Sequence, residues 1–121
     1  MNLRKKILIV EDDTALGDAL CLLLEEAGYE TRLLEQGDLL LQNEYELPHL
    51  FILDRQLAGI DGLDLCRYLK AEPKSKAIPV ILLSATPQVQ KLAATAGADA
   101  FEEKPFRRQV LLPLISQLLK V

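Results

Sequence analysis

The stretch ILIVEDDTAL, residues 7–16, decides the fold of this chain. Its first four residues are aliphatic, and an unbroken apolar run of this kind is typical of a strand buried on both faces of a parallel sheet. Three carboxylates follow at once, Glu11, Asp12 and Asp13, before a helical pattern begins. A buried strand that ends in negative charge predicts a functional site at the carboxyl ends of the strands, where parallel sheets bind their ligands.

Strands and helices alternate along the rest of the chain. Short apolar runs predict strands at residues 6–10, 29–34, 50–53 and 80–83, and more weakly at 98–102. Apolar residues at helical spacing predict helices around residues 16–27, 63–69, 88–96 and 111–118. The segment 35–44 is a poorer helix, because its three consecutive leucines do not define one face. This alternation predicts a parallel sheet covered on both sides, which is a three-layer α/β sandwich.

Polar residues near the helix ends are predicted to be structural. Asp13 or Thr14 is expected to cap the start of the first helix, and Gly28 suits its C-terminal turn. Asp61 and Gly62 are expected to form a turn and a cap before the helix that contains residues 63–69.

The composition limits the function classes. A chain of 121 residues is expected to be one domain, spanning residues 1–121. With 18 acidic and 14 basic residues its net charge is -4, so we expect no nucleic acid bound by this chain itself. No apolar run approaches the roughly 18 residues of a membrane span, and no signal-peptide pattern is present. Cys21 and Cys66 lie singly in apolar helical patterns, which favours a reduced, cytoplasmic protein without membrane contact.

Four predicted strands end in residues that suit phosphoryl chemistry. Glu11 and Asp12 follow the first strand, Asp54 the third, Ser84 the fourth and Lys104 the fifth. Two carboxylates about 4 Å apart repel by roughly 4 kcal/mol at an effective dielectric constant of 20, so the cluster must hold either protons or a cation. An oxygen-only ligand set favours Mg²⁺. The lysine and the hydroxyl suit a phosphoryl group in transfer, with Asp54 as the best placed nucleophile.

Four stretches of the sequence resemble one known family, the response regulator receiver domains of two-component signalling. They are KILIVEDD, LFILDRQLAGIDGLDL, PVILLSA and GADAFEEKPF, in this order and at about the intervals of that family. The resemblance covers nearly the whole chain. It implies a flavodoxin-like, doubly wound sheet of five parallel strands in the order 2-1-3-4-5.

The resemblance also implies how the acidic site works. Asp54 would be the phospho-accepting aspartate. Glu11, Asp12 and Asp54 would hold Mg²⁺ together with the backbone carbonyl of Gln56. Lys104 would pair with the phosphoryl group.

A switch is implied beside that site. Ser84 would be the hydroxyl that bonds the phosphoryl group, and Phe101 would be the switch aromatic. The peptide bond before Pro105 is usually cis in the family, although only about 5 to 6% of X-Pro bonds in folded proteins are cis.

The expected function is therefore a phosphorylation-dependent signalling switch. A histidine kinase or phosphotransfer protein would supply the phosphoryl group, and a downstream effector domain or protein would read the changed surface. A homodimer that forms on phosphorylation is a further expected partner. The chain would not be an enzyme for outside substrates, because it would catalyse only its own phosphorylation and dephosphorylation.

Three other function classes compete with this interpretation. A flavodoxin-like nucleotide binder would offer glycine, serine and threonine donors to a phosphate after the first strand, where the three carboxylates of this chain would repel it. A haloacid-dehalogenase-like phosphatase would need an aspartate nucleophile directly after the first strand, where this chain has Glu11. A receiver-like interaction module that is never phosphorylated is the most serious alternative. The complete set of acceptor, metal-binding, hydroxyl and lysine positions weighs against it.

Three features depart from the family pattern. Ala58 stands where the family usually has a proline, so a ring does not fix the φ of this loop residue. The interval from Ser84 to Lys104 is shorter than expected, which would shorten the loop after the fourth strand or the helix at 88–96. Pro113 lies inside the last helical pattern, where proline removes a backbone donor and costs about 3 kcal/mol. We therefore predict a break or kink within Gln109 to Pro113.

Overall fold

The computed structural model describes residues 4–120, and within them five parallel strands form a single sheet. The spatial order is β2-β1-β3-β4-β5, as the resemblance implied. The strands are β1 (Lys6–Val10), β2 (Glu30–Leu34), β3 (Leu50–Asp54), β4 (Val80–Ser84) and β5 (Ala100–Glu103). The helices are α1 (Thr14–Glu26), α2 (Asp38–Leu41), α3 (Gly62–Ala71), α4 (Val89–Thr95) and α5 (Arg108–Leu119).

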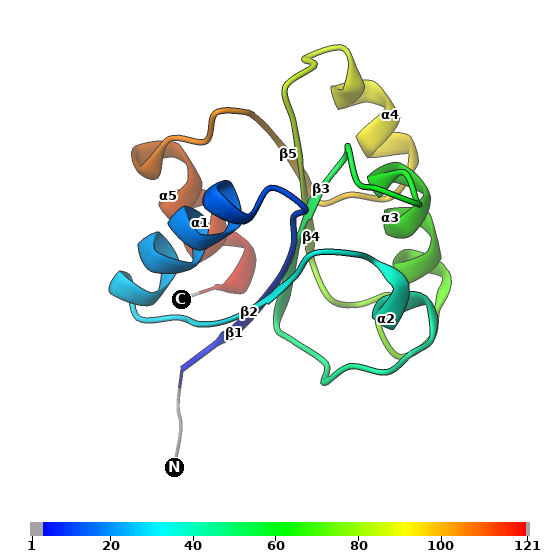
Figure 1. The fold of residues 1–121 in the computed structure, drawn as a ribbon, viewed down its shortest axis with the longest axis horizontal. Coiled ribbons are helices and arrows are strands. Elements are labelled where there is room, and N and C mark those ends of the chain that lie inside the picture. Colours follow the sequence, from blue (N-terminus) through cyan, green and yellow to red (C-terminus); the bar gives the residue numbers. More distant parts are fainter. Residues whose placement is uncertain (1–3, 121) are drawn as a thin grey trace.

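The sheet forms the middle of three layers (Figure 1). Helices α1 and α5 cover one face, and α2, α3 and α4 cover the other. Every residue of β3 and of β4 is buried, which explains why their sequences are apolar without alternation. The sandwich architecture predicted from the alternation of elements is confirmed.

Each face of the sheet packs against its own apolar cluster. On the α1 and α5 side, Leu20 and Leu24 of α1 and Ile115 of α5 pack against Ile9 and Ile52. The opposite cluster joins alternate residues of the same strands to α3 and α4. Because successive strand residues point to opposite faces, one apolar run supplies both clusters.

The helix caps follow the sequence prediction. Asp13 is the N-cap of α1, and its carboxylate accepts a hydrogen bond from the Leu16 amide at 3.1 Å. Asp61 is the N-cap of α3, and its Oδ1 accepts from the Leu63 amide at 2.8 Å. Gly28, just past α1, has a φ of 99°, which a residue with a side chain rarely adopts.

The weakly predicted helix after β2 is a single turn. Only Leu40 of the three consecutive leucines is fully buried, so the segment has little apolar area with which to hold a longer helix on the sheet. Asn43, two residues beyond the turn, has the left-handed φ of 57° that ends helices.

The predicted break near Pro113 is wrong, because α5 continues as one helix from Arg108 to Leu119. Leu111 and Ile115, on either side of the proline, are fully buried, and this packing holds the helix together. Pro113 is itself exposed, as is Gln109, whose carbonyl loses its amide partner and can bond to water instead. A bend of the axis without a break stays a prediction.

Two further expectations concern compartment and cysteine chemistry. Within residues 4–120, no helix has both the length and the apolar character needed to cross a bilayer. Cys21 and Cys66 are both free thiols. Burial raises the pKa of the Cys66 thiol to about 11, which keeps this thiol protonated and unreactive at neutral pH.

Candidate functional site

The parallel strands bring the predicted acidic residues to one edge of the sheet. Glu11 follows β1, Asp54 ends β3, and one carboxylate oxygen from each of Glu11, Asp12 and Asp54 lies within 4.8 Å of the others. Glu11 is 2% exposed and Asp54 3%, whereas Asp12 is exposed. The site thus holds two buried carboxylates and a third that faces water.

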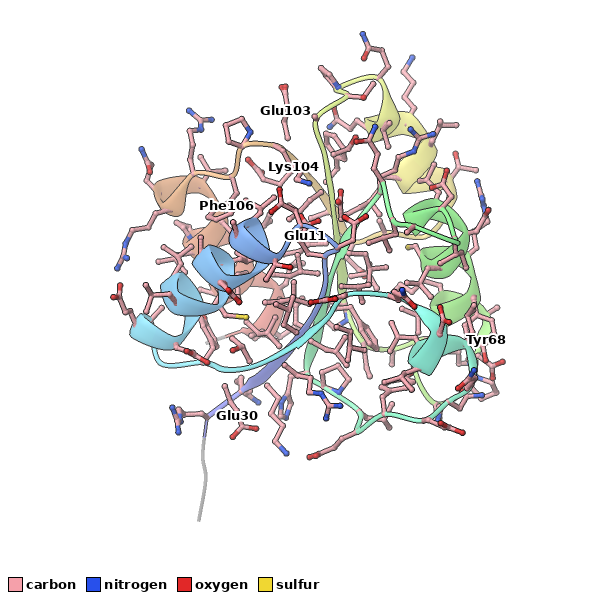
Figure 2. The ribbon with its side chains drawn as sticks, viewed as in Figure 1. Glu11, Glu30, Tyr68, Glu103, Lys104 and Phe106 are labelled. Carbon is pink, nitrogen blue, oxygen red and sulfur yellow. The ribbon has the colours of Figure 1, made fainter. Side chains whose placement is uncertain are left out.

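Lys104 joins the two buried carboxylates. Its Nζ lies 3.0 Å from Glu11 Oε1 and 3.1 Å from Asp54 Oδ2, and its side chain is only 17% exposed. The backbone places it there, because the Lys104 amide donates to the carbonyl of Ser84 at 2.8 Å as β5 ends beside β4. Figure 2 shows Lys104 and Glu11 close together at the strand ends.

One lysine cannot neutralise two buried carboxylates, and the pKa values reflect this. Burial, reinforced by the neighbouring Asp54 carboxyl, raises the pKa of Glu11 to about 7, although Lys104 opposes the change. Burial alone would lower the pKa of Lys104, but its contacts with the two carboxylates outweigh burial and raise it. The site therefore favours either a proton on Glu11 or additional positive charge.

The raised pKa of Glu11 predicts how the stability of the metal-free protein depends on pH. The folded state binds the proton more tightly than the unfolded state, so this stabilisation is complete below the ordinary glutamate pKa of 4.5 and disappears as pH rises through about 7. We expect wild type to lose about 3 kcal/mol relative to Glu11→Gln across this interval. Denaturant titrations in the presence of a chelator measure the difference, and parallel curves for the two proteins would contradict it.

The acidic cluster suits a hard divalent cation. All three side chains offer carboxylate oxygens, which are the ligands that Mg²⁺ prefers. Glu11 Oε1 is buried, and the cation that contacts it among residues 4–120 is the Lys104 ammonium at 3.0 Å. A cation here would supply the positive charge that the two buried carboxylates lack.

A backbone amide two residues further along the chain contacts each of the two buried carboxylates. The Gln56 amide donates to Asp54 Oδ1 at 3.3 Å, while the Asp13 amide donates to Glu11 Oε2 at 3.3 Å. Both carboxylates therefore have one oxygen held by a backbone amide and the other paired with Lys104. This arrangement fixes the orientation of each carboxylate without help from a ligand.

The predicted switch residues lie on β4 and β5, the two strands that follow β3 in the sheet. Ser84 is fully buried at the end of β4, and its hydroxyl accepts a hydrogen bond from the Thr86 amide at 3.0 Å. Phe101 is partly buried, and it packs against the apolar cluster on the α3 and α4 side. The Lys104–Pro105 peptide bond is cis, as the resemblance implied.

The helix between Ser84 and Lys104 is short. Helix α4 has seven residues, Val89 to Thr95, and its buried side chains are Val89 and Ala93. The helix is thus shorter at both ends than the predicted 88–96.

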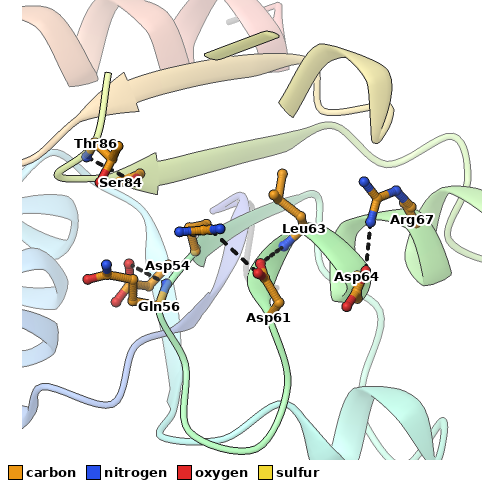
Figure 3. A network of polar contacts seen from close by, with 9 residues as sticks. Asp54, Gln56, Asp61, Leu63, Asp64, Arg67, Ser84 and Thr86 are labelled. Atoms are coloured by element: carbon orange, nitrogen blue, oxygen red, sulfur yellow. Dashed lines mark hydrogen bonds and ion pairs between the residues drawn. The ribbon is translucent and has the colours of Figure 1, made fainter. Parts of the chain in front are cut away.

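The loop from β3 to α3 contains residues that the sequence interpretation did not connect with the site. Arg55 follows Asp54 directly, and its Nε lies 3.5 Å from Asp61 Oδ2 (Figure 3). Gly62 packs so closely that a Cβ atom there would lie 2.2 Å from the Asp54 carbonyl oxygen. The Asp-Gly pair before a helix signals the cap, but nothing in the sequence reveals either contact with the strand end.

Comparisons with known proteins agree with this geometry. A family model described as the response regulator receiver domain matches residues 7–116. The phosphate regulon transcriptional regulatory protein PhoB of Rhizobium meliloti (strain 1021) is 36% identical over 120 residues, covering 95% of this chain and 52% of that protein. The DNA-binding response regulator MtrA of Mycolicibacterium smegmatis is 32% identical over 122 residues, covering 98% of this chain and 52% of that protein. The chain thus spans about half the length of these curated relatives.

A solved structure shares the fold over nearly the full length. The signal receiver domain of a signal transduction histidine kinase from Syntrophus aciditrophicus superposes with a TM-score of 0.87 and 36% sequence identity. The match covers 96% of this chain and 90% of that one. The same strand order and layers therefore occur both in this chain and in a receiver domain of a kinase.

Proposed function

Because this chain belongs to the response regulator receiver domain family, we propose that it is a signalling switch that takes a phosphoryl group onto Asp54. The donor would be a histidine kinase or a phosphotransfer protein, and residues 1–121 would act as one receiver domain. The observation that carries the proposal is the buried Asp54 carboxylate paired with Lys104 at the carboxyl edge of the sheet.

The transfer is a nucleophilic substitution at phosphorus. One carboxylate oxygen of Asp54 would attack the phosphorus of a phosphohistidine. The P–N bond breaks, the imidazole nitrogen keeps the electron pair and is protonated from water, and an acyl phosphate remains on Asp54. Lys104, already 3.1 Å from Asp54 Oδ2, would pair with the oxygens of the incoming group.

Magnesium would be held by Glu11, Asp12 and Asp54, with the backbone carbonyl of Gln56 as a further ligand. When bound, it supplies positive charge against the phosphoryl oxygens. That charge and the ammonium of Lys104 would offset the repulsion between the carboxylates of the site and the incoming phosphoryl group.

The output would follow from the new charge. A phosphoryl group adds about 1.5 to 2 negative charges, which would draw the Ser84 hydroxyl and Lys104 toward it. The Ser84 hydroxyl now accepts from the Thr86 amide, so turning it toward Asp54 would release the start of the loop that leads to α4. Phe101, which lies on β5 beside β4, would respond to the same movement.

The partners follow from the same proposal. The relative MtrA is described as DNA-binding, but this chain spans about half of that protein and carries a net charge of -4. We therefore assign the output to a downstream effector domain or protein rather than to contact of this chain with nucleic acid. The proposal also places the protein in the cytoplasm and includes a homodimer formed on phosphorylation. The chain would catalyse only its own phosphorylation and dephosphorylation.

Asp12→Ala tests whether the acidic cluster binds Mg²⁺ and whether phosphoryl uptake requires that Mg²⁺. Millimolar Mg²⁺ should stabilise wild type, by about 2.7 kcal/mol at one hundred times its dissociation constant, and should be required for phosphoryl uptake from acetyl phosphate. Asp12→Ala should lose most of both effects, whereas Asp18→Ala, which removes an exposed acid from α1, should keep them. Equal stabilisation and equal uptake in wild type and Asp12→Ala would contradict the proposal.

A further inference from the structure

The loop between β3 and α3 closes on itself beside the proposed phosphorylation site. The Gly62 amide donates to the Arg55 carbonyl at 2.8 Å, and Gln56 and Asp61 form an isolated antiparallel bridge. The Arg55 amide in turn donates to the Leu83 carbonyl at 2.8 Å, which anchors the loop to β4. The backbone at Gln56 is therefore fixed by the two ends of this loop.

A single ion pair links the side chains at those two ends. Arg55 Nε lies 3.5 Å from Asp61 Oδ2, and the side chains are 30% and 37% exposed (Figure 3). The other oxygen of Asp61 caps α3 through the Leu63 amide at 2.8 Å. Asp61 thus holds the first turn of α3 with one oxygen and faces Arg55 with the other.

The Arg55 Nε–H group is buried and has no hydrogen-bond acceptor in this structure. A buried donor without an acceptor is unfavourable, and Asp61 Oδ2 is the charged group that faces it. A small closure of the loop would convert the ion pair into a charge-assisted hydrogen bond, which is about twice as strong as a neutral one.

We propose that Arg55 is a positioning residue for the metal-dependent phosphorylation of Asp54, acting through its ion pair with Asp61. This inference rests on the proposed function. The pair holds the two ends of the loop together, and so keeps the Gln56 carbonyl where it can contribute to a cation held by the acidic cluster. By linkage, Mg²⁺ strengthens the Arg55–Asp61 pair by the same factor by which the pair strengthens Mg²⁺ binding.

The direction in which Mg²⁺ affinity changes when Arg55 is replaced separates this role from a simple charge effect. If Arg55 acted only as a nearby positive charge, its removal would strengthen the binding of a divalent cation. If it acts through Asp61, its removal loosens the loop and weakens the binding. Arg55→Met keeps much of the side-chain volume and removes the charge, so it distinguishes the two roles directly.

The test is a double-mutant cycle with Mg²⁺ as the ligand. Arg55→Met, Asp61→Asn and the double variant are titrated with MgCl₂ by calorimetry, and Asn is chosen because it caps helices as well as Asp. Arg67→Met is the matched control, because it removes the exposed Arg67–Asp64 pair within α3. Arg55→Lys, which can still pair with Asp61, is the conservative variant.

We expect each single variant to weaken Mg²⁺ binding about three- to tenfold, and the double variant to be no weaker than either single one. Arg55→Lys should recover most of the affinity, and Arg67→Met should match wild type. Amide exchange at Gly62 in metal-free protein should be faster in Arg55→Met than in Arg67→Met. With acetyl phosphate as donor, Arg55→Met should need a higher Mg²⁺ concentration for half-maximal rate of phosphoryl uptake. Its rate at saturating Mg²⁺ should change little.

Tighter Mg²⁺ binding in Arg55→Met, or additive effects in the double variant, would overturn the positioning role and leave a charge effect. Unchanged affinity in Arg55→Met would also overturn it, while leaving the proposed phosphorylation intact. Failure of wild type to bind Mg²⁺ or take up a phosphoryl group would instead overturn the proposed function, and this inference with it.

Discussion

Gly62→Ala is expected to destabilise the protein by about 3 kcal/mol or more and to reduce phosphoryl uptake. An alanine Cβ at this position would lie 2.2 Å from the Asp54 carbonyl oxygen, 2.7 Å from the Arg55 Cα and 2.9 Å from the Asp54 carbonyl carbon. All three are backbone atoms of the central strand end, so no side chain can move aside. Helix α3 would have to shift away from β3, which would break the 2.8 Å hydrogen bond from the Gly62 amide to the Arg55 carbonyl.

Gly17→Ala is the control for the effect of adding a methyl group to a helical glycine. Its Cβ would meet the ends of the Leu33 side chain at 2.9 and 3.0 Å, and a leucine side chain can move. Alanine also favours a helix over glycine by about 1 kcal/mol, so the net effect should be small. Urea titrations give both values, and a Gly62→Ala protein as stable as Gly17→Ala would contradict the close packing of α3 on Asp54.

The sequence was sufficient to predict the sheet and the acidic edge because both follow from local patterns. Apolar runs such as residues 50–53 that alternate with helical patterns favour a parallel sheet covered on both faces, and the polar residue after such a run then lies at the sheet edge. Asp54, Glu11 and Lys104 were found in this way. Their mutual contacts are those expected of residues that share one strand-end edge.

Features that depend on distant packing were less predictable. The break at Pro113 was wrong because burial of Leu111 and Ile115 outweighs the lost backbone hydrogen bond, and their burial depends on α1 and the sheet. The contact of Gly62 with the Asp54 carbonyl depends on how near α3 lies to β3. Periodicity gives the face that a helix buries, but it does not give the distance between the helix and a strand.

Asp54→Asn is expected to abolish phosphoryl uptake, which is the second large effect. The amide lacks the negative charge of the nucleophile, and its NH₂ group cannot attack phosphorus in the same way. The change also removes one of the two carboxylates that Lys104 contacts, so the variant should remain folded and lose part of the charge conflict with Glu11. Loss of uptake in a folded variant would therefore report chemistry rather than unfolding.

The most direct test of the proposed switch is the intact mass of the protein after incubation with acetyl phosphate and Mg²⁺. Wild type should gain the mass of one phosphoryl group, and peptide mapping after borohydride reduction should locate it at Asp54. Asp54→Asn, with its fold verified by circular dichroism, should gain none. A phosphoryl group taken up stoichiometrically by Asp54→Asn, or no uptake by folded, Mg²⁺-bound wild type, would contradict the assignment of Asp54 as the acceptor.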